Sequence, residues 1–340
     1  MMIEDINKVL INKNTLNMDE FLLKIKNNNV DNQDIISFMK SLIASDIKLE
    51  ENDRFSCISL GGLDEKLETI ISFILKELNV DFNSTSDILS KNKNLSDIYV
   101  EFKNNNNYLL TLSLLLSGCI NEKTSNIVLD IKVGNIIKND EEVENILKLV
   151  KLVEENFNLK VTCFVTNYSM SLGTSFGKNL ELKEIEEILK GENLSSLATL
   201  AIKFSAYIYS CAKKISLELA QNKILDSIKN GSIYNYFKQS ISDDIVLSKR
   251  FFSIKSSKTG FVKRIDILEL NDLLVKVGAL EDKEVGVVFS KQMGDYVLEN
   301  EELAKVYLNN KDILTKELLD CFEIDDKMGE VSPLVTMIVR

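Results

Sequence analysis

The stretch Cys57-Ile58-Ser59-Leu60-Gly61-Gly62-Leu63-Asp64-Glu65-Lys66 decides the fold of this chain. Residues 55–60 read as a strand, and residues 64–78 carry an apolar face at helical spacing, so two glycines join a strand to a helix. Such a turn offers N–H groups and a positive dipole end to an anion. Asp64 and Glu65, however, place carboxylates in the first helical turn, where they satisfy the helix end themselves and repel a phosphate.

The pattern downstream of this turn predicts an α/β fold. Residues 127–133 are rich in β-branched side chains, residues 140–155 carry a helical apolar stripe, and residues 160–165 form another apolar run. A strand, a helix and a strand in this order imply a parallel pair, and hence a mainly parallel sheet with helices on its faces. The glycine-punctuated region after Arg250 predicts a C-terminal β-rich, α+β portion.

The same patterns predict the domain organisation. We expect a small N-terminal helical domain, an α/β domain and a C-terminal β-rich domain. Their boundaries are 1–52 with about 106–120 for the helical domain, 53–105 and 121–245 for the α/β domain, 250–325 for the β-rich domain, and 326–340 for a tail.

Shorter segments are also assigned from their periodicity. Residues 3–10 predict a first helix, and Asn17 is placed to cap a second. Residues 98–102 read as a strand and residues 108–119 as a buried helix. A long helical pattern over 195–229 contains a break near Ser216.

Composition excludes several classes of function. A net charge of −11 disfavours nucleic acid and polybasic membrane contacts. The apolar runs are too short to span a bilayer, and the N-terminus lacks the pattern of a signal peptide. The chain has no histidine, and its five cysteines are scattered, which indicates a reducing, cytoplasmic setting. A zinc site is disfavoured and a histidine-based triad is excluded, so no metal ligand is assigned.

Three stretches resemble the pyrimidine-nucleoside (thymidine) phosphorylases in order and spacing. The first is Ile127-Val-Leu-Asp-Ile-Lys-Val-Gly134, and the second runs from Leu172-Gly173 through Gly177 and Leu180 to Glu192. The third extends from Lys255 to Tyr307 and includes Met293-Gly294-Asp295. The resemblance covers residues 120–322 well and residues 1–66 less closely, so the chain looks like a shortened, divergent member of that family.

This resemblance implies a reaction and its partners. The family are glycosyltransferases that convert a pyrimidine nucleoside and phosphate into the free base and a pentose 1-phosphate. It implies no cofactor, with inorganic phosphate as co-substrate, and a homodimer formed through the helical domain. The expected ligands are therefore a pyrimidine nucleoside or base and phosphate.

Transferring the family's phosphate loop to this chain shows substitutions at the charged positions. The family loop reads Lys-His-Ser-Thr-Gly-Gly, and here Cys57 and Ile58 stand for its lysine and histidine. The residues retained for residual phosphate binding are Ser59, Gly61, Gly62 and Lys66. No catalytic residue is assigned. The alternative for the same residues is a plain capped turn between a strand and a helix.

Other binding groups of the family also lack counterparts. No Ser-Gly-Arg-Gly-Leu-Gly-His-Thr-Gly-Gly run lies between Leu78 and Tyr108, and no Arg-Asp-Val-Thr-Ala-Thr stretch is present. The base-binding serine and lysine fall on Leu114 and Gly118. Lys66 and Lys132 are the cations considered as substitutes, whereas Asp130 and Glu181 are expected to be structural.

Three functional hypotheses follow. The leading one is a homologue with impaired or absent catalysis, in effect a pseudoenzyme. The second is a divergent active pyrimidine-nucleoside phosphorylase, and the third is a structural or regulatory partner of an intact phosphorylase. A relationship to the anthranilate phosphoribosyltransferases is a weaker alternative, because it requires a diphosphate loop and an acidic magnesium pair that the sequence does not clearly contain.

Overall fold

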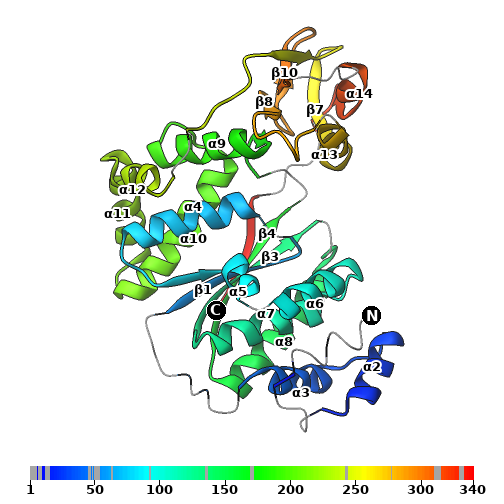
Figure 1. The fold of residues 1–340 in the computed structure, drawn as a ribbon, viewed down its shortest axis with the longest axis vertical. Helices are drawn as coiled ribbons and strands as arrows, with labels where there is room; N and C mark the ends of the chain where they lie inside the picture. The colour runs from blue at the N-terminus through cyan, green and yellow to red at the C-terminus, as the bar shows by residue number, and fades with distance from the viewer. Residues whose placement is uncertain are drawn as a thin grey trace. The chain divides into compact units, whose positions relative to one another are not determined.

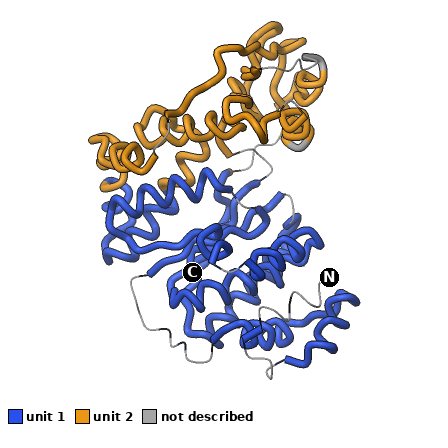
Figure 2. Tube along the Cα trace, in the orientation of Figure 1, with its two compact units in different colours: residues 1–169, 203–222, 334–340 blue, residues 170–202, 223–333 orange. Residues whose placement is uncertain are grey.

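The protein is described from a computed structural model, which covers residues 6, 10–11, 16–44, 47, 49, 54–62, 64–91, 93–134, 137–168, 172–241, 244–276, 278–309, 315–328 and 333–340. The chain divides into two compact units (Figure 2). Unit 1 contains residues 1–169, 203–222 and 334–340, and unit 2 contains residues 170–202 and 223–333. The three domains expected from the sequence remain a prediction.

A five-stranded sheet forms the centre of unit 1. Its order is β12-β4-β3-β1-β2, and β2, β1, β3 and β4 run parallel while β12 pairs antiparallel with β4. This confirms the predicted α/β class with a mainly parallel sheet. The segment set aside as a tail supplies the edge strand β12. The strands are β1 (Phe55–Leu60), β2 (Phe82–Ser84), β3 (Asn126–Val133), β4 (Lys160–Asn167) and β12 (Val335–Val339).

Helices cover both faces of this sheet. Figure 1 shows α4 on one face and α7 and α8 on the other. The α7/α8 face holds a continuous apolar core that includes Ile58, Leu129 and Ile131. On the opposite face, Phe164 of β4 packs edge-on against Phe204, with ring centroids 4.9 Å apart. The helices of unit 1 are α2 (Met18–Lys26), α3 (Asn32–Leu42), α4 (Glu65–Glu77), α5 (Thr85–Ser90), α6 (Lys93–Asn104), α7 (Tyr108–Asn121) and α8 (Asp140–Phe157).

The local predictions can be compared with these elements. Asn17 caps α2 by accepting a hydrogen bond from the backbone N–H of Glu20, and α7 is the expected buried helix. The predicted strand at 98–102 is wrong, because this segment lies within α6. Leu95, Ile98, Tyr99 and Phe102 are buried at helical spacing, a period that a five-residue window conceals. The first predicted helix falls largely outside the described residues.

Unit 2 combines helices with two small antiparallel sheets, ordered β5-β8-β10-β6 and β11-β7-β9. This confirms the β-rich C-terminal portion. Its elements are β5 (Ser175–Phe176), α9 (Lys178–Lys190), α12 (Ser232–Ser240), β6 (Phe251–Lys255), β7 (Gly260–Ile265), α13 (Ile267–Lys276), β8 (Gly286–Phe289), β9 (Tyr296–Val297), β10 (Glu302–Tyr307), α14 (Thr315–Asp320) and β11 (Phe322–Asp325).

Two helices, α10 (Ser196–Lys213) and α11 (Leu217–Lys229), each contribute residues to both units. The separation between them confirms the predicted break near Ser216. Within the described parts of the chain, no helix is both long and apolar enough to cross a membrane.

Candidate functional site

The glycine turn lies at the carboxyl end of β1. Gly61 has a φ of +99°, and a Cβ atom there would lie 2.6 Å from the carbonyl oxygen of Lys132. A Cβ atom on Gly62 would lie 3.2 Å from the Tyr168 ring. Gly61 is therefore required for close packing against the end of β3, and Gly62 lies tightly against the Tyr168 side chain, whether or not a ligand binds.

The first turn of α4 is capped by its own carboxylate. Asp64 is the N-cap residue, and its Oδ1 accepts a hydrogen bond of 3.0 Å from the backbone N–H of Leu67. Glu65 and Glu68 follow in the same turn. The prediction that Asp64 satisfies this helix end is confirmed, and the negative charge is placed where the helix dipole favours it.

The remaining predicted phosphate contacts are buried. Ser59 is 3% exposed, its N–H donates to Thr85 Oγ1 at 3.0 Å, and its hydroxyl lies 3.5 Å from Asp130 Oδ2. Lys66 is the second residue of α4 and is 8% exposed. Ser59, Gly61 and Gly62 thus share one strand end, and their binding of phosphate stays a prediction.

Glu68 is a functional candidate that the sequence analysis missed. Its Oε1 accepts a hydrogen bond from the Thr85 N–H at 3.1 Å, and its Oε2 accepts from the Ser86 N–H at 3.2 Å and the Ser86 hydroxyl at 2.7 Å. The sequence signal is a carboxylate three residues before Ile71 and seven before Leu75, on the buried face of α4. A side chain of the protein therefore occupies the donors at the carboxyl end of β2.

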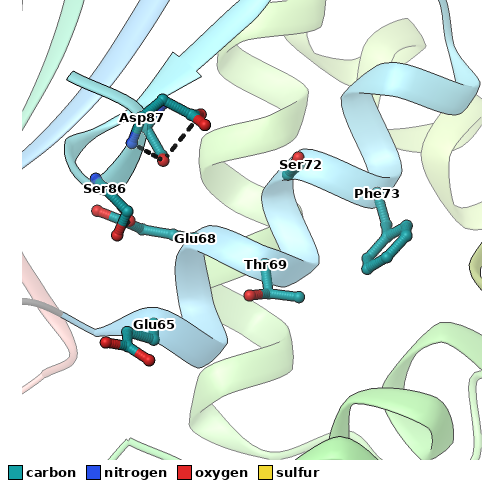
Figure 3. Close-up of a pocket in the computed structure, with 8 residues that line it drawn as sticks. Glu65, Glu68, Thr69, Ser72, Phe73, Ser86 and Asp87 are labelled. Atoms are coloured by element: carbon teal, nitrogen blue, oxygen red, sulfur yellow. Dashed lines mark hydrogen bonds between the residues drawn. The ribbon is translucent and has the colours of Figure 1, made fainter. Parts of the chain in front are cut away.

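An acidic cleft of about 430 Å³ opens beside this contact. Figure 3 shows Glu68 extending from α4 toward Ser86, with Glu65 and Asp87 nearby. Three of the lining side chains are carboxylates, four are hydroxyls and one is aromatic, and none of them is basic. The lining residues are Glu65, Glu68, Thr69, Ser72, Phe73, Ser84, Ser86 and Asp87.

A buried ion pair lies across the turn, at the end of β3. Lys132 Nζ is 2.8 Å from Asp130 Oδ2, and both side chains are 0% exposed. Asp130 Oδ1 also accepts a hydrogen bond from the Thr166 hydroxyl at 2.5 Å. Burial by itself would lower the pKa of Lys132, but the charges of Asp130 and Asp64 outweigh it and raise this pKa, so the ammonium stays charged.

The residues that stand at the family's lysine and serine positions are uncharged and lie in the interior. Cys57 is buried, and burial, followed by the charge of Asp130, raises the pKa of its thiol well above the ordinary value. Leu114 lies in the interior of α7, and a Cβ atom on Gly118 would lie 2.4 Å from Ile88. No described group of three or more cysteine, aspartate or glutamate side chains has an arrangement that would hold a metal ion.

These features define an α/β protein with polar groups at the carboxyl ends of the parallel strands β1, β2 and β3, the edge at which such sheets bind ligands. No family model matches the chain. Three bacterial proteins named pyrimidine-nucleoside phosphorylase are nevertheless similar to it over most of its length. That of Staphylococcus epidermidis is 25% identical over 315 residues, which cover 82% of this chain and 72% of the relative.

The relative from Geobacillus stearothermophilus is 26% identical over 293 residues, and that from Bacillus subtilis is 25% identical over 287 residues. Each match covers 74% of this chain and 66% of the relative. The chain is therefore similar to proteins named pyrimidine-nucleoside phosphorylase, as the resemblance in the sequence indicates, and the matches span about two thirds to three quarters of their length.

Proposed function

We propose that this chain is a catalytically impaired homologue of the pyrimidine-nucleoside phosphorylases, a pseudoenzyme that keeps the scaffold and has lost most of the phosphate- and base-binding residues. The observation that carries the proposal is the internal use of the strand-end donors. Ser59 N–H donates to Thr85, and the Thr85 and Ser86 N–H groups and the Ser86 hydroxyl donate to Glu68. A phosphate would have to displace a buried carboxylate to reach those last three donors.

The charge of the cleft supports the same proposal. A phosphate entering beside Glu65, Glu68 and Asp87 would meet three carboxylates and no basic side chain among the lining residues. Like charges at close range in a partly buried site raise the free energy of the bound state. The cleft therefore disfavours an anionic co-substrate, which phosphorolysis requires.

The expected loss of rate follows from the two basic positions occupied by Cys57 and Gly118. A hydrogen bond to a charged group contributes about 1.5–3 kcal/mol. Two lost contacts of this kind, if both act in the transition state, slow the reaction by about 10²- to 10⁴-fold, since about 1.4 kcal/mol corresponds to a factor of ten.

One observation favours the alternative of a divergent active phosphorylase. Lys132 remains charged at the end of β3, close to the glycine turn, and is one of the two lysines considered as replacements for the lost cations. This alternative requires Lys132 to leave Asp130, which would abandon a buried carboxylate. Separating such a pair is strongly unfavourable, so the impaired homologue is the preferred proposal.

The deciding experiment measures phosphate-dependent release of thymine from thymidine and of uracil from uridine. The purified chain is compared with the Bacillus subtilis relative at equal concentration, and a preparation from cells without the gene controls for contaminating activity. We expect a rate at least about 100-fold below that of the relative. A rate within tenfold of it would overturn the proposal and support the active alternative.

The proposal also includes the cellular location of the protein and its oligomeric state. We place the protein in the cytoplasm and expect a homodimer, with residual binding of a pyrimidine nucleoside or base. Light scattering coupled to size exclusion measures the dimer directly. Calorimetric titration with thymidine, without phosphate, separates a homologue that still binds nucleoside from a purely structural or regulatory partner.

A further inference from the structure

In the parallel sheet of unit 1, the strand order reverses between β1 and β3, because strands that follow β1 in the sequence are added on both of its sides. From β1 the chain passes to β2 on one side, and β3 lies on the other side of β1. The helix after β1 is α4 and the helix after β3 is α8, and they lie on opposite faces (Figure 1). In open α/β sheets, the crevice outside the carboxyl ends of two such strands is the usual place for a ligand.

In this chain, a lysine from the sheet itself lies at that place. Lys132 is the last buried residue of β3, its side chain is 0% exposed, and its Nζ lies 4.9 Å from the centroid of the Tyr168 ring. Asp64, the N-cap of α4, is close enough for its charge to act on the ammonium. The ammonium therefore contacts groups at the ends of β3 and β4, and the charge of Asp64 at the start of α4 acts on it.

The Lys132 ammonium forms an ion pair, but its hydrogen-bonding capacity is not satisfied by the part of the chain that the structure describes. Asp130 Oδ2 lies 2.8 Å away, but among the described residues no acceptor meets Lys132 Nζ in hydrogen-bonding geometry. A buried ammonium with this deficit depends on its carboxylate partner, because removing it from water costs several kcal/mol and hydrogen bonds recover only part of that. The glycine turn packs directly on the Lys132 backbone and on Tyr168.

We propose that Lys132 is an internal ligand of the crevice between β1 and β3. Its ammonium fills the place where an α/β protein would bind a small molecule, and its interactions with Asp130, Asp64 and the Tyr168 ring hold the Gly61–Gly62 turn and the start of α4. Lys132 is thus a positioning residue. The proposal does not depend on whether the chain is an active phosphorylase, because it concerns what occupies the crevice in the free protein.

The test removes the side chain beyond Cβ and then supplies it from solution. Lys132→Ala deletes a propylammonium group, and Lys148→Ala, at a position 65% exposed on α8, is the matched control. We expect Lys132→Ala to lower the midpoint of thermal unfolding by roughly 5–10 °C, and millimolar propylammonium to restore at least half of that shift. 1-Propanol, which has the same number of heavy atoms but no charge, is expected to restore less than a quarter.

Two results obtained with Lys132→Ala would each overturn the proposal. One is Lys132→Ala unfolding within 1 °C of wild type. The other is that propylammonium raises the unfolding midpoint of Lys132→Ala no more than it raises that of Lys148→Ala.

If Lys132→Ala fails to fold, the double variant Asp130→Asn, Lys132→Met removes both charges together. Amide hydrogen exchange in that variant is expected to increase at least tenfold at Gly61, Gly62 and Glu65 and to stay unchanged in α7, and uniform exchange across unit 1 would count equally against the proposal.

Discussion

At the scale of single residues, two buried glutamates accept backbone hydrogen bonds of the kind that a bound anion accepts at a ligand site. Glu68 accepts hydrogen bonds from the N–H groups of Thr85 and Ser86 and from the Ser86 hydroxyl. In unit 2, Glu184 accepts hydrogen bonds from the N–H groups of Thr174 and Ser175 and from the Thr174 hydroxyl. In both places a glutamate from a helix fixes two consecutive backbone groups of a neighbouring segment, so the donors are satisfied within the chain.

The first prediction concerns the charge of Glu68. Glu68→Gln keeps the shape of the side chain but replaces charge-assisted hydrogen bonds with neutral ones and leaves one amide N–H₂ facing donors. We expect the free energy of unfolding of unit 1 to fall by about 1–3 kcal/mol in urea denaturation. Glu65→Gln, in the same helical turn, is the control and is expected to change it by less than about 0.5 kcal/mol. Equal effects of the two substitutions would contradict this assignment.

The second prediction concerns the backbone at Gly61. Gly61→Ala introduces a Cβ atom 2.6 Å from the Lys132 carbonyl oxygen at a φ of +99°, so either β1 or β3 has to move. We expect a loss of at least about 2 kcal/mol in the free energy of unfolding. Gly231→Ala is the matched control, since its φ is +79° but no atom lies within 4 Å of the added Cβ, and it is expected to cost about 1 kcal/mol. A smaller effect at Gly61 than at Gly231 would refute the steric argument.

At the scale of elements, the sequence predicts those segments whose apolar spacing is long enough to fix a period. The sequence identifies β3 and β4 because both strands are rich in β-branched side chains, and it identifies the helix α8 between them because its buried residues recur at helical spacing. The segment 98–102 was misassigned because five residues that include a β-branched pair fit either period, and only the longer stretch from Leu95 to Phe102 shows the helical one.

The candidate site was only partly predictable for a related reason. The glycine turn and the Asp64 cap are local, and a local pattern identifies them. The contact of Glu68 with Thr85 and Ser86 joins residues 17 and 18 positions apart, and the pairing of Lys132 with Asp130 is significant only once burial is known. Contacts between elements depend on how the sheet is assembled, which a single sequence does not specify.

The third prediction is a pH dependence that belongs to α9. Burial tends to raise the pKa of Glu186, but its hydrogen bonds with Lys183 and Lys190 outweigh this and lower it below 4.5. A lowered folded-state pKa means that Glu186 stabilises the fold above its unfolded pKa and that this contribution is lost as the pH falls through the folded value. Glu186→Gln is therefore expected to destabilise unit 2 at pH 6 and to have a smaller effect near pH 3, measured by urea denaturation.

Glu187, its neighbour on the same helix, supplies a control of opposite sign. Burial raises the pKa of Glu187 above 4.5, so its contribution is fully present below the unfolded pKa and is lost as the pH rises through the folded value. Glu187→Gln is expected to be neutral or stabilising at pH 6. If both substitutions destabilised the protein equally at pH 6 and pH 3, the ion pairs at Glu186 would have no role in the pH dependence.

At the scale of the whole molecule, both units use cysteine as a buried apolar residue. Three of the four buried cysteines lie in β1, α7 and β4, and the fourth, Cys321, directly follows α14, while Cys211 is exposed on α10. Burial is the first cause of the raised pKa at each buried thiol, and it brings Cys119 and Cys163 to about 12 and Cys321 to about 11. Because the thiolate is the reactive form, the fold suppresses the chemistry of four of the five cysteines.

The fourth prediction follows from this distribution. In the folded protein at pH 8, a thiol reagent such as dithionitrobenzoate is expected to react rapidly with Cys211 alone, and in denaturant with all five cysteines. Cys211→Ser is the matched variant, and its folded form is expected to lose the rapid phase entirely. Because labelling of the four buried thiols requires opening of the units that hold them, their slow rate reports local unfolding. Rapid reaction at Cys57 would show that the strand beneath the glycine turn is open to solvent, and it would argue against a filled crevice and for a site that still admits ligands.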